Sequence, residues 1–219
     1  MPAMRRARRR RTSSRRRAVE PAALGMRLRA GWASAVLLAG PAEEPRLLAH
    51  QAVELTDPAF PECRQPYHHG NFKLETDPEE IARRTRIVER TTRRAVSKLL
   101  AGYRRQGWEA STAALVVGSL AEPAAIANAH IRAHALEGAL FRSAVAAALA
   151  AAGLPSSVSV ERRLYAEAAA ALGRWEDELR RDLAALGRGT SPWRADEKLA
   201  SLAAWKAISL ESRRQQARR

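Results

Sequence analysis

Two histidines and a glutamate share one face of an alanine-rich segment with helical spacing. His130, His134 and Glu137 stand at i, i+4 and i+7, and a helix turns by about 100° per residue, so the three side chains fall within roughly 60°. The same stripe continues with the core-type residues Phe141, Val145 and Leu149, which indicates that this face turns inward. Imidazole and carboxylate groups placed together in this way could bind zinc or another divalent ion.

A second interpretation of this face needs no metal. Glu137 could orient His134 in a buried hydrogen-bond network, and the spacing is less specific than a recognised zinc signature. His68 and His69, in the segment Gln-Pro-Tyr-His-His-Gly, could add a further ligand from a loop or could simply face solvent. The sequence leaves these alternatives open.

Acidic residues also open the last predicted helix. Asp196 and Glu197 would lie in its first turn, where the helix dipole favours carboxylates for structural reasons alone. They contribute to a site only if they face the helix that carries the histidines. For that arrangement we predict a metal site of His130, His134, Glu137, Asp196 and Glu197. We expect Mg²⁺ or Mn²⁺ as its ion, with Zn²⁺ less favoured.

The positive charge of the chain is concentrated at its ends. The net charge is +15, and residues 1–25 contain nine arginines and one glutamate, with little apolar surface to offset the entropy of ordering. We therefore predict a disordered arginine-rich tail over residues 1–25, a single domain over 26–210 and a basic C-terminal tail over 211–219. The first tail could bind nucleic acid by neutralising phosphates without reading the base sequence. Met26 is a further candidate for the start of the chain.

The single cysteine, Cys63, excludes an intramolecular disulfide and a multi-cysteine metal site. A reducing compartment fits this composition best, so we expect a cytoplasmic protein. The apolar residues 30–39 could alternatively belong to a signal peptide behind the basic tail. No apolar run approaches the roughly 18 residues that a membrane-spanning helix needs, and the oligomeric state is left open.

The apolar pattern predicts an α/β domain. Alternating residues at 28–38 and 47–55 predict a β-hairpin with a turn at 40–45. A proline-rich connection with a short third strand at 71–75 leads to a helix that Asp77 can cap and Gly107 can close. The later elements are a buried strand at 113–117, a helix at 123–152, a strand at 156–160, and helices at 161–172, 175–186 and 193–212.

This order of elements resembles the ribonuclease H-like fold over most of residues 27–210. The resemblance implies one acidic residue in the first strand, another near the fourth strand or the following helix, and a third on the last helix. Together these would bind two divalent metals for phosphodiester hydrolysis. Asp196 or Glu197 matches the last position, and Glu122 or Glu137 could take the middle one. The first-strand carboxylate is missing, because residues 27–39 contain no Asp or Glu.

Two hypotheses about function follow. In the first, the protein is a divalent-metal-dependent, nuclease-like phosphodiester hydrolase in which Glu137 and Asp196 hold the metal and His134 is a ligand or general base. In the second, it is a non-catalytic binding or scaffold protein that has kept the fold, as the missing carboxylate favours. Convergence of the predicted metal residues in the folded chain would favour the enzyme.

Overall fold

The computed structural model describes residues 20–69 and 73–217. The strands within these residues are β1 (Glu20–Arg29), β2 (Trp32–Ala39), β3 (Arg46–Glu54), β4 (His68–His69), β5 (Lys73–Leu74), β6 (Trp108–Val117) and β7 (Ser156–Val160). Five of them form one mixed sheet in the order β3-β2-β1-β6-β7, and β4 pairs with β5 separately. The β1, β2 and β3 strands are antiparallel neighbours, whereas β6 and β7 continue the sheet parallel to β1.

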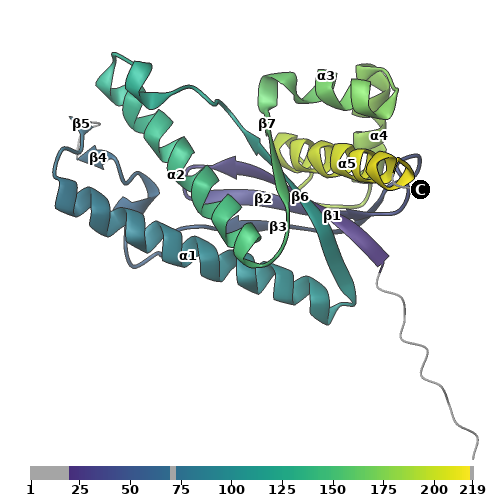
Figure 1. Cartoon of the computed structure of the whole chain (residues 1–219), viewed down its shortest axis with the longest axis horizontal. Helices are drawn as coiled ribbons and strands as arrows, with labels where there is room; N and C mark the ends of the chain where they lie inside the picture. Colours follow the sequence, from purple (N-terminus) through teal and green to yellow (C-terminus); the bar gives the residue numbers. More distant parts are fainter. Residues whose placement is uncertain (1–19, 70–72, 218–219) are drawn as a thin grey trace, which may run out of the picture.

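Helices cover both faces of the sheet in the described part of the chain (Figure 1). One face carries α1 (Pro78–Arg105) and α2 (Ala129–Ala151), and the other carries α3 (Glu161–Leu172), α4 (Glu176–Leu186) and α5 (Ala195–Gln216). Two short 3-10 helices, η1 (Pro61–Arg64) and η2 (Pro123–Ala125), lie in the connections. The fold is therefore three-layered, with the parallel and antiparallel parts of the sheet meeting at β1.

Side chains on β1 alternate between two apolar cores. Leu24 and Met26 pack in the core with α1 and α2, whereas Ala23 packs in the core with α5. Gly25 also faces α5, since a Cβ atom on Gly25 would lie 1.8 Å from the carbonyl oxygen of Ala200. Only glycine allows α5 to approach β1 this closely, and this contact places the first turn of α5 near the carboxyl end of β1.

The antiparallel part of the sheet differs from the predicted hairpin. The strand predicted at 28–38 is divided between β1 and β2, because the chain turns back after Arg29. Gly31 has φ +84 in this turn, a left-handed conformation that glycine adopts at little cost. The predicted turn at 40–45 and the strand after it are present, the latter as β3.

The folded domain also begins before the predicted boundary at residue 25. Ala22, Ala23 and Leu24 in β1 are at most 2% exposed, so a chain that started at Met26 would lack three core residues. The rest of the predicted N-terminal tail, residues 1–19, lies outside the described residues. In the predicted C-terminal tail, residues up to Gln216 extend α5, and residues 218 and 219 lie outside the described part.

The predicted helices are present, with small shifts at their ends. Asp77 caps α1 by accepting hydrogen bonds from two backbone N–H groups of the first turn, as its position before Pro78 predicts. The helix predicted from residue 123 starts at Ala129, because residues 123–125 form η2 instead. No helix among the described residues is long and apolar enough to cross a membrane.

Candidate functional site

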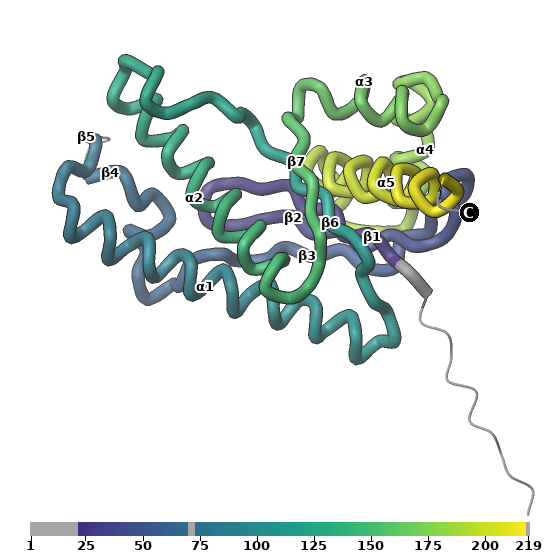
Figure 2. The backbone as a smooth tube through the Cα atoms, viewed as in Figure 1, coloured from purple at the N-terminus to yellow at the C-terminus, as the bar shows by residue number. Residues whose placement is uncertain are grey.

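Three histidines from two distant segments meet beside the first turns of α2. His68 lies in β4, before α1, whereas His130 and His134 lie near the start of α2 (Figure 2). His68 Nε2 is 3.3 Å from His130 Nδ1, and His134 Nε2 is 3.2 Å from His130 Nε2. One nitrogen from each ring lies within 4.8 Å of the other two. With Glu137, these three residues form what we name the histidine cluster.

Glu137 is the most buried member of the histidine cluster, at 1% exposed. Its Oε1 lies 2.7 Å from His68 Nδ1, and its Oε2 lies 3.1 Å from His134 Nδ1. Burial raises the pKa of Glu137 to about 7, and the hydrogen bond with His134 opposes this rise. Burial also lowers the pKa of His68. Glu137 therefore orients two imidazoles from different segments at once.

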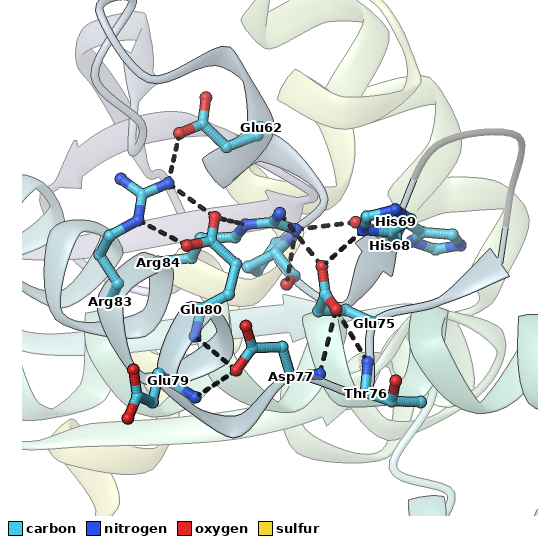
Figure 3. A network of polar contacts seen from close by, with 11 residues as sticks. Glu62, His68, His69, Glu75, Thr76, Asp77, Glu79, Glu80, Arg83 and Arg84 are labelled. Atoms are coloured by element: carbon cyan, nitrogen blue, oxygen red, sulfur yellow. Dashed lines mark hydrogen bonds and ion pairs between the residues drawn. The ribbon is translucent and has the colours of Figure 1, made fainter.

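A network of charged side chains holds the segment that carries His68 (Figure 3). Arg84 in α1 is 8% exposed and donates a hydrogen bond from Nη1 to the carbonyl oxygen of His68 at 2.8 Å. It also donates to Glu75 at 3.2 Å and to Glu80 at 2.7 Å. Glu75 in turn accepts a hydrogen bond from the backbone N–H of Asp77, the largest of the effects that lower its pKa. Through Arg84, α1 fixes the position of His68.

A buried cation occupies the carboxyl end of β1. The Arg27 side chain is 2% exposed, and its guanidinium pairs with Glu161 at the start of α3. Arg27 Nε also lies 3.9 Å from Oδ1 of Asp196 in the first turn of α5. Arg29 donates two further hydrogen bonds to Asp196, at 2.7 and 3.2 Å. We name these four residues the arginine cluster.

A two-metal centre does not fit the arginine cluster. Such a centre needs carboxylates that are free to neutralise and bridge its cations, but the carboxylates of Glu161 and Asp196 accept hydrogen bonds from guanidinium groups instead. Burial lowers the pKa of Arg27, yet a guanidinium stays protonated in proteins. Arg27 therefore stands as a permanent positive charge in the strand for which the resemblance implies a carboxylate.

A pocket of about 240 Å³ borders both clusters. Arg29 lines it from the arginine cluster, and His134 and Glu137 line it from the histidine cluster. Ser119, after β6, and Arg142, in α2, complete its polar lining. The pocket therefore places two guanidinium groups and a hydroxyl beside the Glu137 carboxylate and the His134 imidazole.

The structure brings some predicted site residues together and gives the others different partners. His130, His134 and Glu137 meet, as their spacing predicts. Glu197 instead accepts hydrogen bonds from the backbone N–H of Arg194 at 2.8 Å and from Ser34 Oγ at 3.3 Å. Asp196 is held in the arginine cluster, and Glu122 is exposed at the N-cap of η2.

The two loop histidines separate into one buried and one exposed residue. His68 is 8% exposed and belongs to the histidine cluster, whereas the side chain of His69 is 70% exposed and contacts Glu75 at 3.0 Å. Arg27 was missed by sequence reasoning altogether. Its signal was a single charged residue between the apolar Met26 and Leu28 of a buried strand.

Comparisons with known proteins give structural matches alone. No protein-family model matches the chain, and no curated protein matches it. A RuvC structure from Thermus thermophilus superposes with a TM-score of 0.52 at 15% identity, over 87% of this chain and 96% of that chain. T. thermophilus RuvC in complex with a Holliday junction substrate gives a TM-score of 0.50 at 16% identity, over 87% and 95% of the two chains. This likeness shows that the chain has the ribonuclease H-like α/β fold.

Proposed function

We propose that this protein binds nucleic acid through a ribonuclease H-like domain and does not hydrolyse it with a two-metal centre at the strand ends. The observation that carries the second part is Arg27. Arg27 places a fixed positive charge at the buried end of β1. A pair of divalent metals would require negative charge at this position. This function corresponds to a binding protein that has kept the fold.

The binding surface that we propose is the solvent-facing side of α1. Its exposed cations fall within an arc of about 140° and extend over about 28 Å of helix. They are Arg86, Arg90, Arg93, Arg94, Lys98, Arg104 and Arg105. Among the described residues these side chains form no ion pairs, so their charge is available to phosphates. Glu89 is the one acidic residue in the sequence between the first and last of them.

The fold supports a nucleic-acid partner by analogy. T. thermophilus RuvC, whose structure this chain resembles, was determined with a Holliday junction substrate. We therefore include a four-way DNA junction beside duplex and single-stranded DNA in the binding test. The arginine-rich residues at the N-terminus would add a contribution that is electrostatic and independent of base sequence.

Fluorescence anisotropy with labelled DNA tests this proposal. Changing Arg93 and Arg94 to alanine together should weaken binding and reduce the slope of log Kd against log salt by about 2, because each phosphate contact contributes about 0.9. The matched control changes Arg180 and Arg181 to alanine, another adjacent exposed pair, on α4 across the sheet. Equal losses in the two variants, or no DNA binding by the full chain, would overturn the proposed surface.

The contribution of the tail can be separated from that of α1. Deleting residues 1–19 should weaken binding to every DNA by a similar factor. Deletion through residue 25 should also destabilise the domain, because it removes the buried Ala22, Ala23 and Leu24. A melting curve and a salt titration of each truncation distinguish the two effects.

A second candidate function is metal-dependent phosphodiester hydrolysis at the pocket between the clusters. The observation that favours it is that His134 and Glu137 line this pocket together with Arg29 and Arg142. In this candidate Glu137 and Asp196 are metal carboxylates and His134 is a ligand or general base. It ranks second because Asp196 is engaged by Arg29.

Single-stranded, duplex and branched substrates incubated with Mg²⁺ or Mn²⁺ test the hydrolase candidate. Cleavage that Glu137→Gln abolishes would establish it and would contradict the non-catalytic proposal. If all substrates stay intact with both metals, the hydrolase candidate is excluded.

A further inference from the structure

We propose that His68, His130 and His134 bind one transition-metal ion of the zinc type, with Glu137 as the carboxylate that orients two of the ligands. This inference goes beyond nucleic-acid binding and does not depend on it. The site differs in place and in ligand chemistry from a two-metal carboxylate centre at the end of β1.

The hydrogen bonds of Glu137 determine which imidazole nitrogens carry lone pairs. An ionised Glu137 can only accept, so both His68 and His134 must donate to it from Nδ1–H. Nε2 of each ring is then an unprotonated acceptor. Metal-bound histidines commonly show this arrangement, in which one nitrogen donates to a carboxylate and the other faces the metal.

The two lone pairs face the same third ring. His68 Nε2 and His134 Nε2 lie 3.3 and 3.2 Å from the two nitrogens of His130. A neutral imidazole carries one N–H, so His130 can donate to one of its partners and presents a lone pair to the other. One of the two contacts therefore brings two lone pairs together, and a metal ion shared by the three rings would be bound by such lone pairs.

The distances fit one ion after a small movement of one ring. Ligands arranged tetrahedrally at 2.0–2.1 Å from zinc lie about 3.3 Å apart, and one nitrogen from each histidine already lies within 4.8 Å of the others. His130 is exposed, as is His134, so a rotation of the His130 side chain can close the remaining gap without disturbing the core. Three protein ligands leave the fourth position for water.

The other ligands are held in place before any ion arrives. Glu137 is buried and fixes two rings, and Arg84 binds the carbonyl oxygen of His68 at 2.8 Å. Ligands that are already positioned lose less entropy on binding. Three imidazoles favour Zn²⁺, Co²⁺ or Ni²⁺, whereas Mg²⁺ and Mn²⁺ prefer oxygen ligands.

Metal binding by the full, untagged chain tests the proposal. After treatment with a chelator, calorimetric titration with Zn²⁺ should show one ion per chain, and Co²⁺ should give the visible absorption of a four-coordinate site. Mg²⁺ should not compete. His68→Ala, His130→Ala and His134→Ala should each abolish the Co²⁺ spectrum, and Glu137→Gln should weaken Zn²⁺ binding about 10- to 100-fold.

Two other histidines provide matched controls. His50 packs against Trp193 and His69 is exposed beside the cluster, so His50→Ala and His69→Ala should retain the affinity of the unaltered chain. Absence of stoichiometric Zn²⁺ binding would overturn the proposal. So would a His130→Ala variant that binds as tightly as the unaltered chain. Because His130 is exposed, this variant tests the site even if His68→Ala does not fold.

Discussion

The histidine cluster and the arginine cluster compensate the negative charge of their carboxylates in different ways. Both place buried or half-buried carboxylates near the carboxyl ends of strands or the first turns of helices. In the arginine cluster, Arg27 and Arg29 supply two positive charges to Glu161 and Asp196, so the group is neutral by itself. In the histidine cluster, Glu137 is surrounded by imidazoles and no guanidinium or ammonium group contacts it in the described residues.

This difference separates a structural cluster from the metal site that we propose. A cluster that contains its own permanent cations has its carboxylate oxygens already engaged, and an added metal would meet like charge. A cluster of oriented imidazole lone pairs is instead the environment that we propose binds a cation from solution. The following predictions test this contrast, from the largest expected effect to the smallest.

Removing the built-in cation should cause the largest loss of stability. Arg27→Met removes the buried guanidinium that donates to Glu161 and to the backbone carbonyl oxygens of Leu28 and Val116. Because the two carbonyls are buried and lose this donor, the substitution should lower the free energy of unfolding by about 3 kcal/mol. Arg29→Met is the matched control, since Arg29 also binds Asp196 but its side chain is 42% exposed; it should cost less than about 1 kcal/mol. Urea denaturation measures both, and equal losses would show that burial does not distinguish the two arginines.

Adding Zn²⁺ should stabilise the histidine cluster alone. Zn²⁺ at 100 times its Kd should raise the free energy of unfolding by about 2.7 kcal/mol. The same increment, within about 0.5 kcal/mol, should appear in Arg27→Met, because separate clusters act additively. It should be absent in His68→Ala. Thermal melts with and without zinc provide the measurement, and a smaller increment in Arg27→Met would show that the clusters are coupled.

Without metal, Glu137→Gln should lower the free energy of unfolding by about 1 to 2 kcal/mol. A carboxylate can accept from both His68 and His134, whereas the amide of glutamine presents a donor to one of them. Glu122→Gln is the control, because Glu122 is exposed and its substitution should change stability by less than about 0.5 kcal/mol. If Glu137→Gln left the free energy of unfolding unchanged, this would indicate that the carboxyl group is already protonated in the folded protein.

The smallest effect concerns the network behind His68. Hydrogen bonds lower the pKa of Glu80 from its usual 4.5 to about 2, with the bond from Arg83 as the largest cause and the bond from Arg84 as the second. Its contribution to stability is therefore full above its usual pKa and is lost as the pH falls towards the lowered value. Glu80→Gln should make the urea midpoint fall less between about pH 5 and about pH 2, whereas Glu79→Gln, at the exposed neighbour, should behave as the unaltered chain does. Parallel pH profiles for all three proteins would contradict this.

Local spacing was enough to predict the parts of the molecule that depend on neighbouring residues. The shared face of His130, His134 and Glu137 follows from the helical repeat, because residues one and two turns apart lie together on any helix. The cap at Asp77 and the strand at 156–160 are also local features. The fold class followed from the order of these elements, and the structural comparisons confirm it.

Contacts between distant segments were decided by the tertiary structure. His68 meets Glu137 across 69 positions of the chain, and Arg27 meets Glu161 across 134. Neither pairing has a local signature, because each depends on which strands are neighbours in the sheet and where the following helices begin. The sequence by itself determined that imidazoles and a carboxylate share a helix face and that residues 27–39 contain no Asp or Glu. Only the packing of β1, α3 and α5 decided that the buried Arg27 lies beside Glu161 and Asp196, since burial requires each charge to find a partner wherever the fold provides one.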